Sequence, residues 1–444
     1  MSSASPKRRR RRGVILTAVG LDKLLAAKAD VEFEENAGNR YTLEDLNERT
    51  GLAVDTLTKV FACELKVDKQ SIKTCFRAFN LDLESRDFYY PDEEDREEVP
   101  APSPQLDLEE PELPEGQVPL NSRFYIERPP AESEGFKTVL QSGALIRIKG
   151  ARRMGKSSLM SRILDHAARR HCQTVQLSFQ LADRGVFQDF NRLLQWFCAG
   201  VGLGLQLPNR LQDYWDELFG SQISCKSYFE QYLLAQTSNP LVLGLDDVDR
   251  LFEYPEIAGD FFSLLRTWHE QGKNSEVWKQ LRLVVVHSTD VYIPLDANKS
   301  PFNVGLPINL VPFTPEQILE LANRYGLGWS LVEAHKLADL VGGQPYLVKK
   351  GIYHIWHEDT TLDELITAEV DGDTIYGAHL QWQLLHLQRQ PQLAEAFQRV
   401  LEAAAWQNLS MHESLQLQQL GLIDWQDKQP VPSCRLYGEF FSRI

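Results

Sequence analysis

The residues best suited to chemistry form one short segment, in which a glycine, four other residues and a second glycine precede a lysine and a serine. Backbone N–H groups that curl around a phosphate need such glycines, because glycine tolerates positive φ and has no side chain in the way. The spacing therefore predicts a loop that binds the phosphates of a nucleoside triphosphate. This phosphate loop comprises Gly150, Ala151, Arg152, Arg153, Met154, Gly155, Lys156 and Ser157.

Several positions in and beside this loop have an expected role. Lys156 would neutralise β- and γ-phosphate oxygens, which makes it both a binding and a catalytic residue, and Ser157 would ligate Mg²⁺. Residues 144–148 have the apolar pattern of a strand. A helix that starts near Ser158 would point its positive dipole end at the phosphates. Strand, loop and helix together give the setting that the motif requires.

A second candidate element is an apolar run that ends in carboxylates at Asp246, Asp247 and Asp249. Asp246 is the expected magnesium ligand. Asp247 occupies the place where a carboxylate would polarise the attacking water, because phosphoryl transfer asks the protein mainly for positioning and charge stabilisation. The alternative is a polar strand end with solvated carboxylates or a helix N-cap, and it suits Asp249 best because apolar residues follow it.

A third apolar run, residues 281–286, is followed by His287, Ser288 and Thr289. A polar residue at the end of such a strand can sense the γ-phosphate, and Ser288 or Thr289 would fill that role. Simple capping of the strand end is the alternative.

Composition limits the class of protein. The chain has 444 residues, which suggests about three domains, and 43% of them are hydrophobic. No apolar run is long enough to span a membrane, and the first residues do not predict secretion. Six cysteines show no paired C-x-x-C spacing, which argues against a zinc or redox site. We expect a cytoplasmic protein with reduced cysteines.

Charge is distributed unevenly along the chain. The formal charge of −15 argues against a surface that binds nucleic acid as a whole, yet residues 7–12 are all basic. We expect residues 1–13 to form a disordered basic arm that contacts DNA or another polyanion, or alternatively a solubilising tail. Residues 91–119 are acidic and rich in proline, which predicts an extended linker.

Residues 14–90 have a helical pattern. The apolar spacing predicts a helix over residues 14–27, and Thr42 with Asp45 has the pattern of a capping box. A glycine-containing turn and a helix over residues 55–61 then predict a helix-turn-helix-like domain, whose second helix would enter a DNA groove. A helical bundle that binds protein is the alternative. The expected DNA contacts are Thr56, Thr58, Lys59 and Lys69.

The phosphate loop and several further segments resemble the bacterial AAA-like P-loop ATPases of the STAND class, over roughly residues 120–444. Residues 50–80 resemble the helix-turn-helix module called the vWA-MoxR-associated N-terminal domain, which often precedes this ATPase. The ATPase likeness rests on residues 124–130, 143–157, 246–252, 261–269, 284–289, 300–305 and 342–346.

This resemblance implies a multidomain α/β fold. Its parts are a P-loop NTPase three-layer αβα core over residues 120–312, a helical lid over residues 313–375 and a winged-helix domain over residues 376–444. It also implies that ATP and Mg²⁺ are bound by a signalling switch with a protein partner. Nucleotide would change the assembly of the chain, as a homo-oligomer, or the exposure of its attached domains.

The resemblance also implies roles for single residues. Pro345 matches the position from which the lid of these ATPases contacts the nucleotide, although proline also stiffens a turn between helices. Glu127 and Arg128 match a segment near the nucleotide, or form a rigid connection. Many hydrolysing relatives have glutamate where this chain has Asp247, so we expect weak conversion of ATP and water to ADP and phosphate. The candidates for an arginine finger are Arg250, Arg266 and Arg282.

Two other functions remain alternatives. One is a DNA-remodelling or transposition-type ATPase, and the other is a kinase that acts on a small molecule. The kinase is disfavoured because lid and winged-helix segments, rather than a substrate cleft, follow the ATPase motifs. Three tryptophans near the C-terminus are expected in a core or an interface: Trp382, Trp406 and Trp425.

Overall fold

The computed structural model groups the chain into two compact units, residues 1–107 and 108–444. The basic run 7–12, Thr289, Trp406 and linker residues 91–110 lie outside the described residues. The described residues are 13–17, 20–21, 23–25, 27–28, 31, 41–62, 66–79, 81, 83, 87–89, 111–288, 304–368, 374–402 and 409–443.

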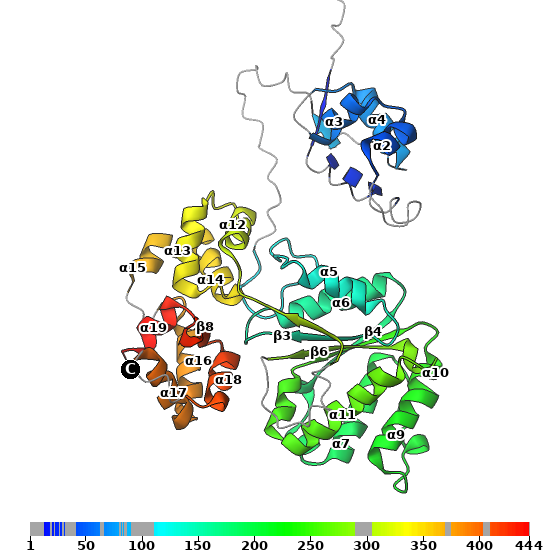
Figure 1. Cartoon of the computed structure of the whole chain (residues 1–444), viewed down its shortest axis with the longest axis vertical. Helices are drawn as coiled ribbons and strands as arrows, with labels where there is room; N and C mark the ends of the chain where they lie inside the picture. Colours follow the sequence, from blue (N-terminus) through cyan, green and yellow to red (C-terminus); the bar gives the residue numbers. More distant parts are fainter. Residues whose placement is uncertain are drawn as a thin grey trace, which may run out of the picture. The chain divides into compact units, whose positions relative to one another are not determined.

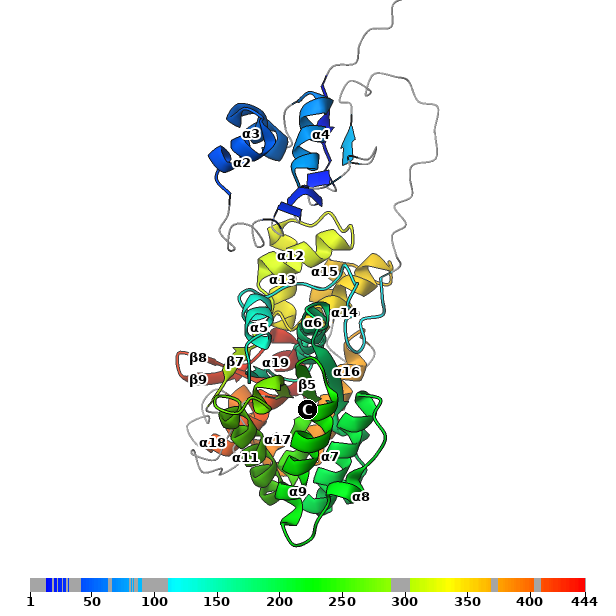
Figure 2. The same cartoon turned by 90° about the vertical axis from the view of Figure 1, so that its right-hand side faces the viewer.

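In the N-terminal unit, short helices surround a buried apolar cluster (Figure 2). Helix α2 (Leu43–Thr50) begins at the predicted capping box, where the Asp45 N–H donates to the Thr42 hydroxyl and the Thr42 N–H donates to the Asp45 carboxylate. Helices α3 (Val54–Ala62) and α4 (Lys69–Ala78) follow. The cluster includes Leu46, Leu57, Val60, Ile72, Cys75 and Phe76.

The predicted helix over residues 14–27 is wrong in its first part. Residues Ile15–Leu16 form strand β1, which pairs antiparallel with β2 (Phe88–Tyr89), and Val14 forms a bridge with Val67. The described residues from 20 to 31 are helical. The local apolar spacing could not show that a distant segment completes a sheet, and such pairing overrides local preference.

A five-stranded parallel sheet forms the centre of the C-terminal unit, in the order β4-β5-β6-β3-β7. Strand β3 precedes the phosphate loop, and β6 separates it from the acidic strand β5. Because all these strands run in the same direction, their carboxyl ends share one edge, where such sheets bind ligands. The bounds are β3 (Leu145–Lys149), β4 (Gln173–Ser178), β5 (Leu241–Asp246), β6 (Leu281–His287) and β7 (Leu306–Asn309).

Helices cover both faces of this sheet (Figure 1). Neighbouring strand residues face opposite ways, so Leu243 packs in the apolar cluster of α7 and α11, whereas Val242 packs in that of α5 and α6. A parallel sheet needs this double cover because both of its faces are apolar. The helices are α5 (Ala131–Val139), α6 (Lys156–Arg169), α7 (Phe190–Gly204) and α11 (Pro255–Gln271).

Shorter elements connect these layers. They are the 3-10 helices η2 (Phe179–Leu181), η3 (Arg184–Gln188), η5 (Val248–Glu253) and η6 (Trp278–Gln280), the helices α8 (Leu211–Tyr214), α9 (Gly220–Tyr228) and α10 (Leu234–Gln236), and the π-helical turn η4 (Phe229–Leu233). Among the described residues, no helix is both long and apolar enough to cross a membrane.

The remaining helices share a separate apolar cluster beside the sheet. Four precede residue 370, and they are α12 (Pro315–Arg324), α13 (Leu331–Val341), α14 (Pro345–Trp356) and α15 (Leu362–Thr367). The last elements are α16 (Gly377–Gln388), α17 (Pro391–Leu401), α18 (Met411–Leu420), the antiparallel hairpin of β8 (Ile423–Gln426) and β9 (Gln429–Pro432), and α19 (Arg435–Phe441).

Trp268 on α11 tests how much the sheet depends on its helical cover. Its side chain is 1% exposed and packs against the rings of Phe229 and Trp278. We expect Trp268→Ala to lower the free energy of unfolding by about 3 to 5 kcal/mol, because it removes a large buried side chain and leaves a cavity. Trp425 is 44% exposed, so Trp425→Ala should cost less than about 0.5 kcal/mol in the same urea titration. Equal losses of unfolding free energy in the two variants would contradict the role of Trp268 in packing α11 against its neighbours.

Candidate nucleotide-binding site

The phosphate loop lies between β3 and α6, as the motif requires. Its backbone takes positive φ at Arg153 (65°) and at Gly155 (85°), the N-cap residue of α6. Glycine suits this position because φ is positive, and a Cβ at Gly155 would make a close contact of 3.2 Å with the Arg128 guanidinium. The Lys156 ammonium donates to the carbonyls of Gly150 and Ala151, each at 2.9 Å.

The charge of Lys156 is balanced by carboxylates at the ends of the strands. Burial lowers the pKa of Lys156, and Asp249 and Asp246 oppose that shift. Asp246 is the last residue of β5 and is buried. Burial raises its pKa, while a hydrogen bond with the Ser157 side chain lowers it. Ser157 and Asp246 thus present adjacent oxygen donors, a set that fits Mg²⁺.

Asp247 adopts a left-handed conformation, with φ 55° and ψ 32°, directly after β5. Ser178 is the last residue of β4, and its hydroxyl donates to the Asp247 carboxylate at 2.7 Å. A non-glycine residue with positive φ is uncommon, and here it turns the carboxylate of Asp247 toward the neighbouring strand end. Asp247 lines the same cavity as Lys156 and Ser157.

Asp249 is half-buried and hydrogen-bonded rather than fully solvated, and it is not a helix N-cap, which corrects the alternative suggested by the sequence. Its carboxylate accepts from the N–H and from the hydroxyl of Ser288, each at 2.8 Å. The residue at the N-cap position of η5 is Asp247. The hydrogen-bond partner of Asp249 follows a strand that is distant in the sequence, so local context could not reveal the contact. Ser288 is buried at the end of β6.

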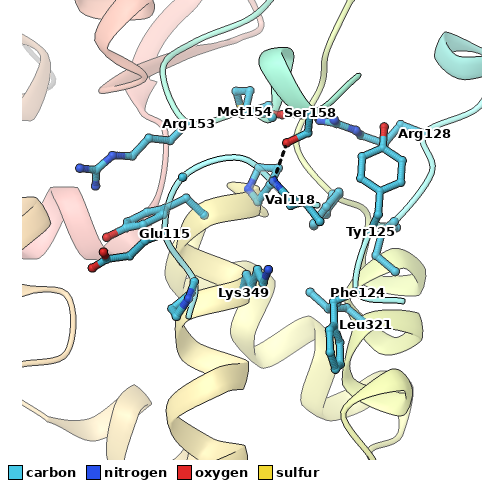
Figure 3. Close-up of a pocket in the computed structure, with 17 residues that line it drawn as sticks. Glu115, Val118, Phe124, Tyr125, Arg128, Arg153, Met154, Ser158, Leu321 and Lys349 are labelled. Carbon is cyan, nitrogen blue, oxygen red and sulfur yellow. Dashed lines mark hydrogen bonds between the residues drawn. The ribbon is translucent and has the colours of Figure 1, made fainter. Parts of the chain in front are cut away.

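Two cavities meet at the loop. The phosphate cavity, of about 580 Å³, lies at the carboxyl ends of β5 and β6 and is lined by Lys156, Ser157, Asp246, Asp247, Asp249 and Ser288 among others. The second, which we call the base cavity, has a volume of about 520 Å³ (Figure 3). Both cavities share Gly116, Arg153, Gly155 and Ser158 as lining residues, so together they suit a ligand with a phosphate end and an apolar end.

Side chains from several parts of the chain surround the base cavity, among them Glu115 and Val118 of the segment 112–119 (Figure 3). Phe124, Tyr125 and Arg128 come from the segment before α5, Met154 and Ser158 from the loop and α6, and Leu321, Pro345 and Lys349 from α12 and α14. Pro345, predicted to contact nucleotide from the lid, therefore lies in the wall of this cavity. Its apolar and aromatic lining has the character of a site for a flat ring system.

Residues 112–119, expected to belong to the linker, instead pack on α6, and we call them the strap. The Val118 N–H donates to the Ser158 hydroxyl at 3.0 Å, and Arg162 donates to the carbonyls of Val118 and Pro119. Glu112 accepts from Ser122 and forms an ion pair with Lys349 at 3.5 Å. The predicted linker is therefore too long at its C-terminal end, because polar groups of α6 and α14 hold its last residues.

The segment that bears Glu127 and Arg128 also supports the phosphate loop. Arg128 is buried and donates to the Met154 carbonyl at 2.6 Å. Its own N–H donates to Glu132 at 2.9 Å. The side chain of Glu127 is exposed, and its carbonyl accepts from Gln317 at 2.8 Å. Of the two candidates, Arg128 contacts the loop directly, while Glu127 links the core to α12.

Arg152 and Arg153, at loop positions for which the motif specifies no residue type, contact the C-terminal helices. The Arg152 guanidinium lies 5.2 Å from the ring centroid of Trp382, and the Arg152 N–H donates to the Gln419 carbonyl at 3.2 Å. The Arg153 guanidinium lies 4.2 Å from the ring centroid of Tyr346 and donates to His379 Nδ1. Trp382 and His379 lie on α16, so this helix interacts with both arginines of the loop.

A family model described as an AAA-like domain matches residues 113–443, three quarters of the chain, including the phosphate loop and the C-terminal hairpin. The chain belongs to the AAA-like domain family. The matched segment begins within the strap and ends after α19, so the strap and the C-terminal helices are both parts of this P-loop ATPase domain.

A relative of the chain is a much longer protein. The chain is 26% identical over 226 residues to an uncharacterized WD repeat-containing protein of Synechocystis, a match that covers 48% of this chain and 18% of that protein. The chain therefore spans less than a fifth of that relative's length.

Similar solved structures include a Walker-type ATPase of Pyrococcus abyssi, with 13% identity, 72% of this chain and 96% of that chain covered and a TM-score of 0.48. The ORC2 protein of Aeropyrum pernix has 15% identity, coverage of 72% and 96%, and a TM-score of 0.41. A STAND protein with a tetratricopeptide repeat sensor from Pyrococcus horikoshii has 14% identity, coverage of 76% and 44%, and a TM-score of 0.33.

The candidate arginine fingers of the AAA-like domain are engaged within the chain. Arg266 donates to Glu270 on its own helix, and Arg282 donates to two backbone carbonyls before β6. Arg250 donates to the carbonyls of Phe179, Gln180 and Ala182. Of the three, Arg250 lines the phosphate cavity. Arg250 therefore stays the candidate for an arginine finger that acts within its own chain.

His379 was not singled out from the sequence, yet its hydrogen bonds determine its protonation. Arginine only donates, so His379 Nδ1 must accept from Arg153, and Nε2–H then donates to the Tyr437 hydroxyl. Protonation of Nδ1 would abolish the contact with Arg153. Burial, with Arg153 and Lys350 close by, lowers the pKa of His379 to about 3.

Trp425, expected in a core or an interface, is exposed.

The lowered pKa of His379 predicts a pH dependence of stability. The unfolded chain binds a proton at His379 below an ordinary pKa of 6.5, whereas the folded chain does not do so until about pH 3. Stability should therefore fall as the pH drops below 6.5 and not change through His379 above it. We expect His379→Gln, which keeps an acceptor and a donor, to reduce the dependence of the unfolding free energy on pH by up to about 1.4 kcal/mol per pH unit below pH 6.5. Urea unfolding at several pH values measures this, and an unchanged slope contradicts it.

Proposed function

We propose that this chain is an ATP-binding signalling ATPase of the STAND type, whose conformation or assembly changes when ATP and Mg²⁺ bind. The observation that carries the proposal is the contact of Arg152 and Arg153 with α16. These arginines belong to the loop that would surround the phosphates. A ligand in the loop therefore has a direct physical route to the C-terminal helices.

The residues of the phosphate cavity support binding of a triphosphate. Lys156 would neutralise β- and γ-phosphate oxygens, and Ser157 with Asp246 would hold Mg²⁺, which supplies further positive charge there. Asp247 would orient the attacking water as general base. Its side chain is one methylene shorter than glutamate and is bonded to Ser178, which supports weak hydrolysis. The base cavity, with Pro345 in its wall, would take the adenine ring.

In this proposal the C-terminal helices act as two bodies. Residues 313–375 form the lid, and residues 376–444, with the β8–β9 hairpin as the wing, form a winged-helix domain that contacts the loop. The hairpin at residues 423–432, followed by α19, supports this assignment. The winged-helix domain would therefore sense the nucleotide rather than read DNA.

The N-terminal unit would pass the signal to a partner. We propose a helix-turn-helix-like domain that binds a partner protein or, with the basic arm, DNA. Thr58 is exposed and Lys59 is half-buried, while the Lys69 ammonium lies 4.1 Å from the ring centroid of Phe88. Thr58 is therefore available to a partner, whereas Lys69 is partly engaged. A nucleotide-dependent homo-oligomer belongs to the same proposal.

Lys156→Ala tests the nucleotide site. Removal of the ammonium from the loop should weaken ATP binding at least about 100-fold while the chain stays folded, because a buried phosphate loses its charged partner. Calorimetry with Mg²⁺ and a non-hydrolysable ATP analogue measures the affinity, and light scattering on the same samples measures the mass. Unchanged affinity would refute the site, and an unchanged mass with bound nucleotide would restrict the switch to one chain.

Trp382→Ala tests the contact between the loop and α16. Loss of the ring removes cation–π contacts with Arg152 and Arg153, worth about 0.5 to 2 kcal/mol in total, and should speed release of a bound fluorescent nucleotide by roughly two- to thirtyfold. Trp425→Ala, on the exposed hairpin, is the matched control. Release rates that are equal in both variants would contradict a role for the contact in nucleotide binding.

A DNA-remodelling or transposition-type ATPase is the alternative function. Hydrolysis stimulated by DNA would favour it. Hydrolysis that does not respond to DNA, together with assembly that depends on nucleotide, would favour the signalling switch.

A further inference from the structure

The Asp249 carboxylate holds the residue that ends the neighbouring strand. Asp249 lies in η5, after the acidic strand β5, and Ser288 follows β6. The Ser288 N–H donates to Oδ1 at 2.8 Å and to Oδ2 at 3.1 Å, and the Ser288 hydroxyl donates to Oδ2 at 2.8 Å. Because β5 and β6 pair in parallel, this contact joins the two segments that follow them.

The hydroxyl of Ser288 has only one proton, and a carboxylate can only accept. That proton points to Asp249, so the hydroxyl offers the phosphate cavity lone pairs but no donor. A phosphate oxygen is itself an acceptor. Ser288 can therefore donate to a terminal phosphate only if its hydroxyl rotates away from Asp249, while its N–H keeps the two segments joined.

Asp249 and Ser288 also line a third cavity, of about 250 Å³, which shares these two residues and Arg152 with the phosphate cavity. Its other wall belongs to the C-terminal helices and includes His386, Gln390, His412 and Leu420. A rotation of the Ser288 hydroxyl thus changes the polarity of a surface that these helices share. Asp249 and Ser288 therefore lie between the phosphate cavity and the C-terminal helices, which would respond to the phosphates.

We propose that Asp249 is a positioning residue that holds Ser288 in place and releases the Ser288 hydroxyl to a terminal phosphate. This inference rests on the proposed function, because it places the phosphates beside Lys156. ATP binding then costs one hydrogen bond to a carboxylate, a cost that ADP binding does not carry. Asp249 thereby sets the ratio of the affinities for triphosphate and diphosphate.

Asp249→Asn tests the inference without a need for hydrolysis. The amide oxygen still accepts from the Ser288 N–H, and the amide N–H donates to the Ser288 oxygen, which leaves the hydroxyl proton for the phosphate. The affinity for a non-hydrolysable ATP analogue relative to ADP, measured by calorimetry with Mg²⁺, should rise about tenfold.

Two controls separate the hydrogen bond from the charge. Glu253 is an exposed carboxylate that lines the same cavity, so Glu253→Gln measures the effect of losing a negative charge there. In a Ser288→Ala background, Asp249→Asn should raise the ratio much less than it does in the unaltered protein, because no hydroxyl remains to be released, and the remaining change measures the loss of the Asp249 charge near Lys156. If Asp249→Asn unfolds in a thermal melt, Asp249→Ala serves instead, since its side chain has no acceptor and leaves the Ser288 hydroxyl proton available.

A ratio that stays unchanged in Asp249→Asn, or that rises equally with and without the Ser288 hydroxyl, overturns the role of Asp249. If such a result accompanies binding that depends on Lys156, the inference fails and the proposed function stands. Failure of the unaltered protein to bind either nucleotide overturns both.

Discussion

The half-buried ammonium of Lys156 is the constraint on which the rest of the site depends. A charge that loses contact with water is costly unless it is paired, and the chain pairs this one with two loop carbonyls and with the field of Asp246 and Asp249. A phosphate would compete with those carbonyls for the same protons. The carboxylates must lie close by without sealing the loop, which requires β5 and β6 to end beside it. The strand order provides this arrangement, because β6 lies between β3 and β5.

Local patterns in the sequence were sufficient for much of this arrangement. The spacing of Gly155 and Lys156 predicts the loop, the carboxylates after an apolar run predict the acidic strand end, and Thr42 with Asp45 predicts a capping box that the structure confirms. The family match bears out the P-loop ATPase core. These predictions succeed because each depends on residues within one turn or one strand, where spacing along the chain translates directly into geometry.

The features that the sequence did not reveal depend on contacts between distant segments. Arg153 and His379 are 226 positions apart, and the loop motif leaves position 153 unspecified, so no pattern connects them. Ile15–Leu16 becomes a strand because residues 88–89 pair with it, and Val14 bridges to Val67. Strap residues have the composition of a linker, yet Arg162 and Ser158 bind their backbone. In each case a hydrogen-bond partner far along the chain determines a structure that local composition leaves open.

Separate parts of the chain thus border the three parts of the predicted nucleotide position. The strap and α14 border the base cavity, α16 contacts the loop, and the pair Asp249 and Ser288 borders the terminal-phosphate end. A ligand shifts a conformational equilibrium only by the difference in its interactions with the two states. ATP and ADP share the base and the first two phosphates, so contacts at the strap and at Arg153 would favour both alike. Under the proposed function, discrimination would come from the terminal-phosphate end, where Lys156 would meet the additional charge and where the Ser288 hydroxyl has one proton for which two acceptors would compete.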